Sequence, residues 1–493
     1  MADQVVDFNG IPSDILTPGV YVEFDNSLAV QGLTNQTNRI ILLAPMLDTG
    51  TAEPNVPVQV TSAAEGKRLA GVGSIAASML SAIFSVTGSV ETWLLPIEDP
   101  ESGVAAKGTV TITGSPTESG TLSLYVAGTL VQVGIGVGDT PAEVATAIAA
   151  AVNAEADLPC TAQATDKIVT LTCRHKGTIG NDIDLRLNFY ASQKTPAGLA
   201  LELASFADGT GSHDIEDAIA ALGTTQYLTM ISAFADDVNL PLIEAELDQR
   251  WGPLFQNDSH CFIGIRGTVG TINSTLSTRN SPHVTAITCE TGGEPQPVWE
   301  KAALVGAMAA YYLNIDPARP LKELPLPGRL PAAVSKRWTR EERNLILSYG
   351  GATTYVDEGG NVVLERCPTT YTQTSSGIND PSYQQTESMY ILSRLRYQLR
   401  ARLLQRFPRC SLVGDETEIP AGSSRVNPKT IRAEIGVLAS EWVDEGLIED
   451  RDQFMEDLIV VRDPNVVTRV NVRMSPNLVN QLFVVAVKNS FIL

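Results

Sequence analysis

Several features that would indicate a secreted or membrane-bound protein are missing from the sequence. No apolar run approaches the roughly 20 residues that a membrane-spanning helix needs, and the N-terminus lacks a positive segment followed by an apolar one. Six cysteines are scattered without a CxxC pair or a histidine at zinc spacing, so reduced thiols are expected. We therefore predict no membrane insertion, and a chain that is kept in a cytoplasm or leaves it by a route that needs no signal.

Basic residues are few relative to acidic ones. The 493 residues include 35 Lys and Arg against 56 Asp and Glu, a net charge of −21. Phosphate binding needs clustered positive charge, so this composition opposes a general affinity for nucleic acid or anionic membranes. Residues 202–258 hold eleven acids against Arg250, whereas residues 386–409 hold six arginines against Glu387. Either run can be a solvated face, and the alternative is an acidic body with one basic element that contacts an acidic partner.

Motifs for catalysis or cofactor binding are also missing. The chain has four histidines, no GxSxG nucleophile elbow and no phosphate-binding GxxxxGK. The glycine-rich stretches 71–76 and 134–140 lack the full GxGxxG pattern, and the acidic pairs at 236–237 and 415–416 are not spaced as metal ligands. We predict no catalytic residue, no cofactor and no metal ion.

Strand and helix patterns alternate in two separate regions. The run RIILLAPML from Arg39 is continuously apolar, as in a strand buried on both sides, and a helical stretch (63–85) and the strand VETWLLPI follow it. The same order resumes with strands at 226–234, 260–267 and 283–290 and helices at 240–251, 270–277 and 298–313. This alternation predicts an α/β core, a mixed sheet flanked by helices, formed by residues 27–102 and 211–335.

Between these two regions the pattern changes to short strands with turn signals. Residues 103–210 contain segments such as GTVTITG and KIVTLTCRH, interrupted by one alanine-rich helix at 141–154 with Asp139 or Thr140 as its N-cap. Small residues mark both ends of the segment, as in hinges. We expect a β-rich outer domain inserted into the core.

The last third of the chain follows a proline-rich passage at 316–332. A short helix, a hairpin with a Gly359-Gly360 turn and two long helices at about 381–405 and 428–446 precede the final strand-like segments. This order predicts an α+β C-terminal domain at 336–478.

Strand patterns are also expected near both ends of the chain. In TPGVYVEFDNS (17–27), apolar and polar residues alternate after a Pro-Gly bend, behind a polar leader without hydrophobic periodicity. At the other end, QLFVVAVKNSFIL has the composition of a strand. Residues 1–26 and 479–493 are therefore assigned to extended N- and C-terminal strand arms.

Four segments together resemble the contractile tail sheath proteins of Mu-like bacteriophages. They are PGVYVEFDNS, GNVVLERCPTTYTQTSSGINDPSYQQTESMYILSRLRYQLRARL, VNPKTIRAEIGVLASEWVDEGLIEDRDQFMEDLIVVRDP and SPNLVNQLFVVAVKNSFIL. The resemblance covers the N-terminal arm, much of the core and nearly all of the last third, whereas the insert is similar in placement and in HKGTIGNDIDLRL. Part of the family's core is often labelled subtilisin-like, which implies no protease here because the nucleophile motif is missing.

The resemblance implies a structural subunit and not an enzyme. Such a sheath is a helical homo-oligomer of stacked rings around an inner tube, and it shortens and widens to drive the tube into a host cell during genome ejection. The implied partners are other copies of the chain, the tail tube protein, and the baseplate and tail terminator proteins. The implied location is the tail sheath of the virion, after assembly in the host cytoplasm. Since no nucleotide site is visible, the work of contraction is expected to be stored at assembly in a kinetically trapped extended state.

The strand arms are the expected connections between subunits. Identical subunits that meet head to tail generate helical assemblies, and terminal strands can tie them by adding to the edge of a neighbour's sheet. We predict such contacts for Val20, Tyr21, Val22 and Phe24, and for Leu482, Val484, Ala486 and Phe491. The alternative is that both strands complete the subunit's own sheet.

The arginine-rich helix is the expected contact with the tube. On a helical projection, an apolar stripe consists of Leu392, Leu395, Leu399, Leu403 and Phe407. A separate polar stripe consists of Arg394, Gln398, Arg402, Gln405 and Arg409. Similar sheaths contact the tube through their C-terminal domain, so the polar stripe is predicted to contact acidic tube subunits.

Two other functions remain open from the sequence. The first is the sheath of a phage-derived bacteriocin or injection machine, with the same fold and mechanics, which only a neighbouring capsid gene would separate from a phage sheath. The second is a cytoplasmic α/β hydrolase with an inserted β-domain, which labelling by a covalent serine-hydrolase probe would support.

Overall fold

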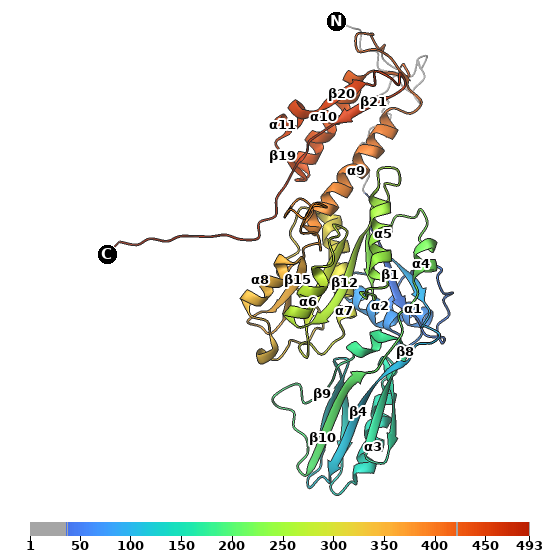
Figure 1. The fold of residues 1–493 in the computed structure, drawn as a ribbon, viewed down its shortest axis with the longest axis vertical. Helices are drawn as coiled ribbons and strands as arrows, with labels where there is room; N and C mark the ends of the chain where they lie inside the picture. The colour runs from blue at the N-terminus through green and yellow to red at the C-terminus, as the bar shows by residue number, and fades with distance from the viewer. Residues whose placement is uncertain (1–35, 37, 421–422, 493) are drawn as a thin grey trace, which may run out of the picture.

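The protein is an elongated stack of a β-rich insert, an α/β core and a C-terminal lobe, with a C-terminal segment that leaves the stack sideways (Figure 1). The structure, a computed structural model, describes residues 36, 38–420 and 423–492. Within these residues, no helix is both long enough and apolar enough to cross a membrane.

The core is built on a mixed sheet. In the described residues it has nine strands in the order β14-β16-β15-β13-β12-β11-β1-β3-β2. The strands are β1 (Arg39–Pro45), β2 (Val58–Val60), β3 (Glu91–Ile97), β11 (Thr229–Ser232), β12 (His260–Gly267), β13 (Val284–Glu290), β14 (Leu324–Pro325), β15 (Gly351–Val356) and β16 (Val362–Arg366). From β3 to β15 the neighbours are parallel, and β2, β16 and β14 pair in antiparallel fashion at the two edges. The expected α/β core is thus present.

Helices cover both faces of this sheet, which explains why its central strands are apolar throughout. On β1, Ile40 and Leu42 pack with α2 (Ile75–Val86) and α7 (Val298–Ile315). Ile41 and Leu43 on the opposite face pack with a second set of helices. That set is α4 (Glu216–Ala221), α5 (Leu240–Trp251), α6 (Val269–Leu276) and α8 (Arg340–Ser348).

The helix expected at 63–85 is two helices. The first, α1 (Ala63–Ala70), ends at Gly71, and α2 begins after Ser74, whose hydroxyl accepts from the Ala77 N–H as an N-cap. Gly71 and Gly73 have φ of 89° and 79°, a left-handed backbone that glycine adopts readily. The glycine-rich stretch at 71–76 is therefore a turn between helices followed by the first residues of α2.

The expected boundary between core and C-terminal domain at 335/336 is too early. Strands β15 and β16 extend the core sheet beside β13, so the core continues through residue 366. The proline-rich passage is not a free linker, because Leu321, Leu326 and Ala332 are buried against the core, and η2 (Val334–Lys336) follows them. The prolines interrupt the helix and strand patterns of the sequence, which suggested a domain boundary, but the core continues beyond them.

The insert consists of two packed sheets and one helix. Its elements are β4 (Ala105–Gly114), β5 (Gly120–Val126), β6 (Thr129–Ile135), α3 (Pro141–Ala154), β7 (Cys160–Thr165), β8 (Ile168–Lys176), η1 (Thr178–Asp182), β9 (Leu185–Leu187) and β10 (Leu199–Ala207). The strand orders are β10-β4-β8-β7 and β6-β5-β9. Thr140 is the N-cap of α3 and forms a capping box with Glu143. The insert lies below the core in Figure 1.

The C-terminal lobe packs around the buried Trp442. Its elements are α9 (Thr386–Arg406), β17 (Ser411–Leu412), β18 (Arg425–Val426), α10 (Pro428–Asp444), β19 (Ile448–Glu449), α11 (Arg451–Asp457), β20 (Ile459–Arg462), β21 (Val470–Arg473) and β22 (Asn477–Leu478). Its apolar cluster joins Leu395 of α9 to Leu438 and Trp442 of α10 and to Phe454 of α11. The lobe has the expected α+β composition.

Candidate assembly interface

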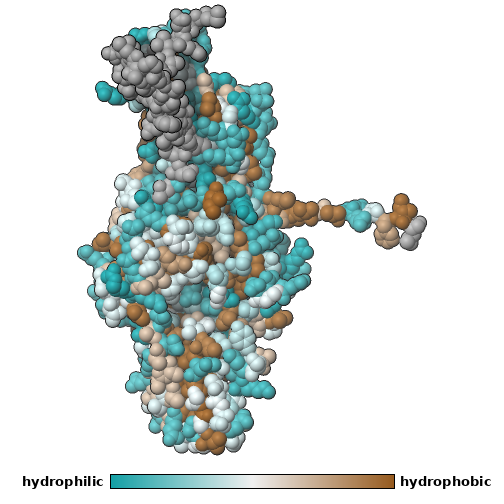
Figure 2. Space-filling model, turned by 180° about the vertical axis from the view of Figure 1, so that it is seen from behind, coloured by the Kyte–Doolittle hydropathy of each residue, from teal (hydrophilic) through white to brown (hydrophobic). Residues whose placement is uncertain are grey.

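The C-terminal segment is extended and exposed. Residues 479–492 form no helix or strand, and the segment projects from the body in Figure 1 and is largely brown, hence apolar, in Figure 2. Leu482, Val484 and Phe491 are 65%, 79% and 81% exposed, and Ala486 is exposed as well. These are the four residues predicted for the C-terminal arm.

The segment was expected to be a strand, but it pairs with no strand among the residues that the structure describes. Beyond Val479, its backbone groups form no strand pairing with the described residues, so they lack the partners that a strand needs. Leu482 and Val484 alternate along the chain with Phe483 and Val485, so an extended conformation would present apolar residues on both faces. Strands of this kind are found where both faces are covered.

The base of the segment is fixed to the body. The Val479 N–H donates to the Leu447 carbonyl at 3.2 Å, next to the β19–β22 pair. The guanidinium of Arg366 lies 4.5 Å from the centre of the Phe483 ring. The exposed part thus begins at a defined place. The residues predicted for the other arm, Val20, Tyr21, Val22 and Phe24, lie outside the described residues.

The hairpin of β20 and β21 has open edges. Within the described residues these antiparallel strands pair only with each other. Val460 packs into the lobe, whereas Ile459 and Val461 are 41% and 48% exposed on the opposite face. An open edge of this kind can accept a further strand.

The polar stripe predicted on α9 is largely used inside the chain. Gln398 is buried and accepts from the Trp442 indole N–H at 2.8 Å. Arg402 is 8% exposed and bonds to Glu434 at 3.0 Å and to Glu441, both on α10. Arg394 donates to the carbonyl of Asn314 at the end of α7, and burial lowers its pKa. The expectation of a free polar stripe is therefore wrong for these three residues, because α10 and α7 cover that face.

The remaining residues of the stripe are accessible. Gln405 in the last turn of α9 and Arg409 beyond it are exposed. A neighbouring arginine outside the stripe, Arg396, binds Asp258 at 2.6 Å and stacks 4.1 Å from the Trp251 ring centre. The acidic stretch 202–258 thus supplies part of the partner for the basic helix within the same chain.

A histidine–aspartate pair lies where the insert meets the core. Asp99 follows β3 and accepts from His175 Nδ1 of β8 at 2.8 Å, with His213 at 3.4 Å. The other ring nitrogen of His175 accepts the Ile75 backbone N–H at 3.1 Å. In a serine hydrolase this nitrogen would contact the nucleophile. Here it contacts a helix N-terminus, so the pair joins insert and core.

A second polar contact between insert and core involves Asp182 in η1. It binds the Arg266 guanidinium of β12 and accepts the Val298 N–H at the start of α7 at 2.7 Å. Arg266 also donates to carbonyls of the loop after β13, at Glu294 and Gln296. The insert is thus fixed to the carboxyl ends of the core strands.

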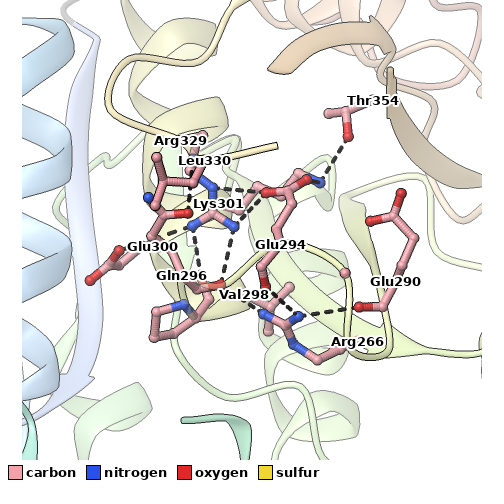
Figure 3. A network of polar contacts seen from close by, with 12 residues as sticks. Arg266, Glu290, Glu294, Gln296, Val298, Glu300, Lys301, Arg329, Leu330 and Thr354 are labelled. Carbon is pink, nitrogen blue, oxygen red and sulfur yellow. Dashed lines mark hydrogen bonds and ion pairs between the residues drawn. The ribbon is translucent and has the colours of Figure 1, made fainter. Parts of the chain in front are cut away.

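The same loop contains a buried ion cluster (Figure 3). Glu294, 2% exposed, accepts from Lys301 at 2.5 Å and from Arg329 at 2.6 Å. Burial opposes ionisation of this carboxyl, but the two cations outweigh it and lower the pKa of Glu294 to about 2. Lys301 also donates to the hydroxyl of Thr354 in β15 at 2.8 Å. The cluster therefore joins α7, the proline-rich passage and strand β15 of the core sheet.

These groups do not fit a metal site. Cys289, Glu290 and Glu294 place potential ligand atoms within 4.8 Å of one another. A metal ion there would have to displace Lys301 and Arg329 from Glu294. The pairing instead indicates a structural role.

Comparison with known proteins matches the insert, most of the core and the C-terminal part of this architecture to known domains. The phage tail sheath protein central domain matches residues 208–370, the phage tail sheath protein β-sandwich domain matches 101–201 and the phage tail sheath C-terminal domain matches 379–492. The Mu-like prophage FluMu tail sheath protein of Haemophilus influenzae is 38% identical over 489 residues, which span 99% of this chain and 100% of the relative.

A solved sheath structure shares the fold at low sequence identity. The sheath tail protein of Desulfitobacterium hafniense is 12% identical with a TM-score of 0.51, over 94% of this chain and 97% of that one. The contracted sheath of an extracellular contractile injection system has a TM-score of 0.49 at 10% identity, over 97% and 98% of the two chains.

The matches to all three domain models and along the full length define the class: the chain belongs to the phage tail sheath protein family. Within that class, it is a homologue of the tail sheath of Mu-like phages. The resemblance seen in the sequence and the sheath role that it implied are confirmed.

We predict that Arg402→Ala loosens the C-terminal lobe. The change leaves Glu434 and Glu441 without their shared cation, and the loss is expected to be about 2 kcal/mol, as for hydrogen bonds to charged groups. Amide hydrogen exchange of α10 should become faster by more than tenfold. Arg400→Ala removes an exposed arginine from the same helix and should leave exchange unchanged. Equal exchange in both variants would contradict the assignment.

We also predict a pH-dependent effect of Glu294→Gln. The folded-state pKa of Glu294 lies below its ordinary value of 4.5, so its ion pairs stabilise the fold fully above about pH 4.5 and less as pH falls toward 2. At pH 7 the variant should be less stable by on the order of 3 kcal/mol, and urea unfolding should show this difference shrinking at pH 3.5. The exposed Glu358→Gln is the control. A difference that stays constant with pH would contradict the prediction.

Proposed function

We propose that the chain polymerises helically around the inner tube of a phage tail and contracts from a metastable extended state to drive the tube through the host envelope. The observation that carries this proposal is the C-terminal segment, which is extended, apolar on both faces and paired with no strand in the described part of the chain. A subunit with such a segment is incomplete alone. Its natural complement is the open sheet edge of another copy.

The proposed acceptor is the β20–β21 hairpin of a neighbouring subunit. Its free edges offer main-chain hydrogen bonds, and its exposed Ile459 and Val461 offer an apolar surface. Residues 482–491 would add to it as a strand, and Val20–Phe24 of a further subunit would add at the other edge. Donor and acceptor are different surfaces of one chain, so the contact is heterologous and propagates as a helix.

The strand connections also explain how the sheath could change shape without coming apart. Main-chain hydrogen bonds at the arms would hold neighbours together while the globular bodies rotate and exchange one packing for another. The extended arrangement is then a kinetically trapped state whose energy is stored at assembly. On this proposal the chain is a structural protein and not an enzyme, and the sheath assembles in the host cytoplasm.

The proposed tube contact is the exposed end of α9. Gln405 and Arg409 are the two residues of the predicted polar stripe that are exposed, and we propose that they contact acidic tube subunits. Exposed ion pairs are individually worth only ~0 to 1 kcal/mol, so many repeated contacts can hold the tube and still release it. The baseplate and the tail terminator are the proposed partners at the two ends. A bacteriocin-like particle would use the same contacts.

Deletion of residues 482–493 should abolish polymerisation. Without the donor strand, we expect a folded monomer with an unchanged circular dichroism spectrum, where the full chain forms hollow tubes in negative-stain electron microscopy. Val484→Asp with Val485→Asp should have the same effect, because each charge falls on one apolar face. Val484→Ile with Val485→Ile is the matched control and should form tubes. Normal tubes from the deletion would sink the proposal, and deletion of residues 1–26 tests the other arm in the same way.

Arg409→Glu should impair assembly on the tube and not the fold. The reversal replaces attraction to an acidic tube by repulsion, while Arg409 lies outside the lobe's apolar cluster. The measurement is the yield of sheathed tubes when the variant is mixed with purified tube. Arg340→Glu, an equal charge change on the exposed start of α8, is the control. Equal yields from both variants would reject this tube contact.

A further inference from the structure

Two cysteines lie directly opposite each other in the insert. Cys160 begins β7, and Cys173 is its partner in the adjacent antiparallel strand β8. Directly opposed residues project to the same face of a sheet. Both side chains are buried, at 0% and 3% exposure, and both are free thiols.

The backbone hydrogen bonds show which type of pair this is. The Arg174 N–H donates to the Pro159 carbonyl at 2.8 Å, so the flanking residues form the bond and the cysteines are a non-hydrogen-bonded pair. In such pairs the Cα atoms are about 4.5 Å apart. This separation lies within the range of about 4.4 to 6.8 Å that a disulfide spans.

No other cysteines share this arrangement, and all six lie in the described residues. In the core sheet, Cys261 is opposite Val284 and Cys289 is opposite Arg266. Cys367 follows β16, and Cys410 follows α9. The pairing is therefore specific to the β7–β8 hairpin.

We propose that Cys160 and Cys173 are a reversible disulfide site that closes when the chain meets a low-molecular-weight disulfide. The thiolate of one cysteine attacks the small disulfide, forms a mixed disulfide and releases one small thiol. The second cysteine then displaces the other small thiol and forms the cross-strand bond. Two protein thiols are oxidised, one small disulfide is reduced to two thiols, and the two protons go to the released thiolates.

The burial of the two cysteines determines the conditions under which this reaction occurs. Burial, with Cys173 nearby, raises the pKa of Cys160 to about 12, and burial raises the pKa of Cys173 to about 12. Thiolate is therefore scarce at neutral pH, and reaction needs local opening. Opening is available because β7 is the edge strand of its sheet. The pair stays reduced in a reducing cytoplasm and oxidises slowly outside the cell, where the proposed function places the assembled chain.

The bond would connect the edge of the insert to its attachment point. β8 continues from Cys173 to His175, whose ring binds Asp99 of the core at 2.8 Å. A disulfide to Cys160 would tie edge strand β7 to this anchored strand. We expect slower exchange of the β7 amides in the oxidised protein.

The test uses the full chain with Cys410→Ser, which removes the one partly exposed thiol. Protein is treated with oxidised glutathione, denatured, alkylated and mapped by mass spectrometry. We expect a linked peptide that contains Cys160 and Cys173, lighter by two hydrogens and restored by dithiothreitol. Cys173→Ser should give no linked peptide at all.

A second experiment tests whether the two cysteines are placed to form a disulfide, independently of whether the reagent can reach them in the folded protein. The same protein is unfolded and refolded in a glutathione redox buffer, so that exchange occurs before the thiols are buried. The proposal expects the Cys160–Cys173 link to exceed every other cysteine pair by at least tenfold in the refolded protein. Folded protein without this link, or with links to Cys261 or Cys289 in equal amount, would overturn it.

Discussion

One continuous helix determines how the two upper parts of the molecule are related. The first half of α9 belongs to the core, where Thr386 donates to the Cys367 carbonyl at 2.7 Å and the hydroxyls of Tyr390 and Thr229 are 2.8 Å apart. Its second half belongs to the C-terminal lobe, through Gln398 and Arg402. Because one helix carries both sets of contacts, the lobe cannot turn against the core without bending α9 or breaking buried hydrogen bonds. The position of α9 therefore determines where the β20–β21 hairpin and the C-terminal segment lie relative to the core.

The sequence predicted the positions of helices and strands better than the contacts that surround them. Apolar runs and capping patterns located the parallel strands, α5 and α3, because these patterns follow from burial on two faces and from local hydrogen bonds. The two stripes on α9 do not match its burial, because Gln398 and Arg402 are buried whereas Leu399 and Leu403 are only half-buried. Periodicity shows which residues share a face but not what covers it, and the partners Glu434 and Glu441 lie more than 30 residues further along the chain. Strand register is equally invisible, so the opposition of Cys160 and Cys173 needed the structure.

Attachment of the insert follows a different principle from that of the lobe. The two segments that connect the core to the insert are joined by a β-bridge between Val104 and Thr210. Asp99 of the core then binds His175 of the insert, and Asp182 of the insert binds the Val298 N–H of the core. His175, Asp99 and Asp182 are residue types that a motif search could assign to catalysis, and here they hold the insert against the core. Sequence spacing could not reveal this, since the partners come from strands far apart in the chain.

The exposed C-terminal segment has a consequence for the subunit before it assembles. About ten apolar-rich residues are exposed and pair with no strand among the described residues, and in this they resemble the edge strands that nucleate aggregation. In a crowded cell, productive addition to a growing polymer therefore competes with off-pathway association of free chains, and both rates rise with concentration. The balance between the two therefore depends on how many free chains are present for each growing end.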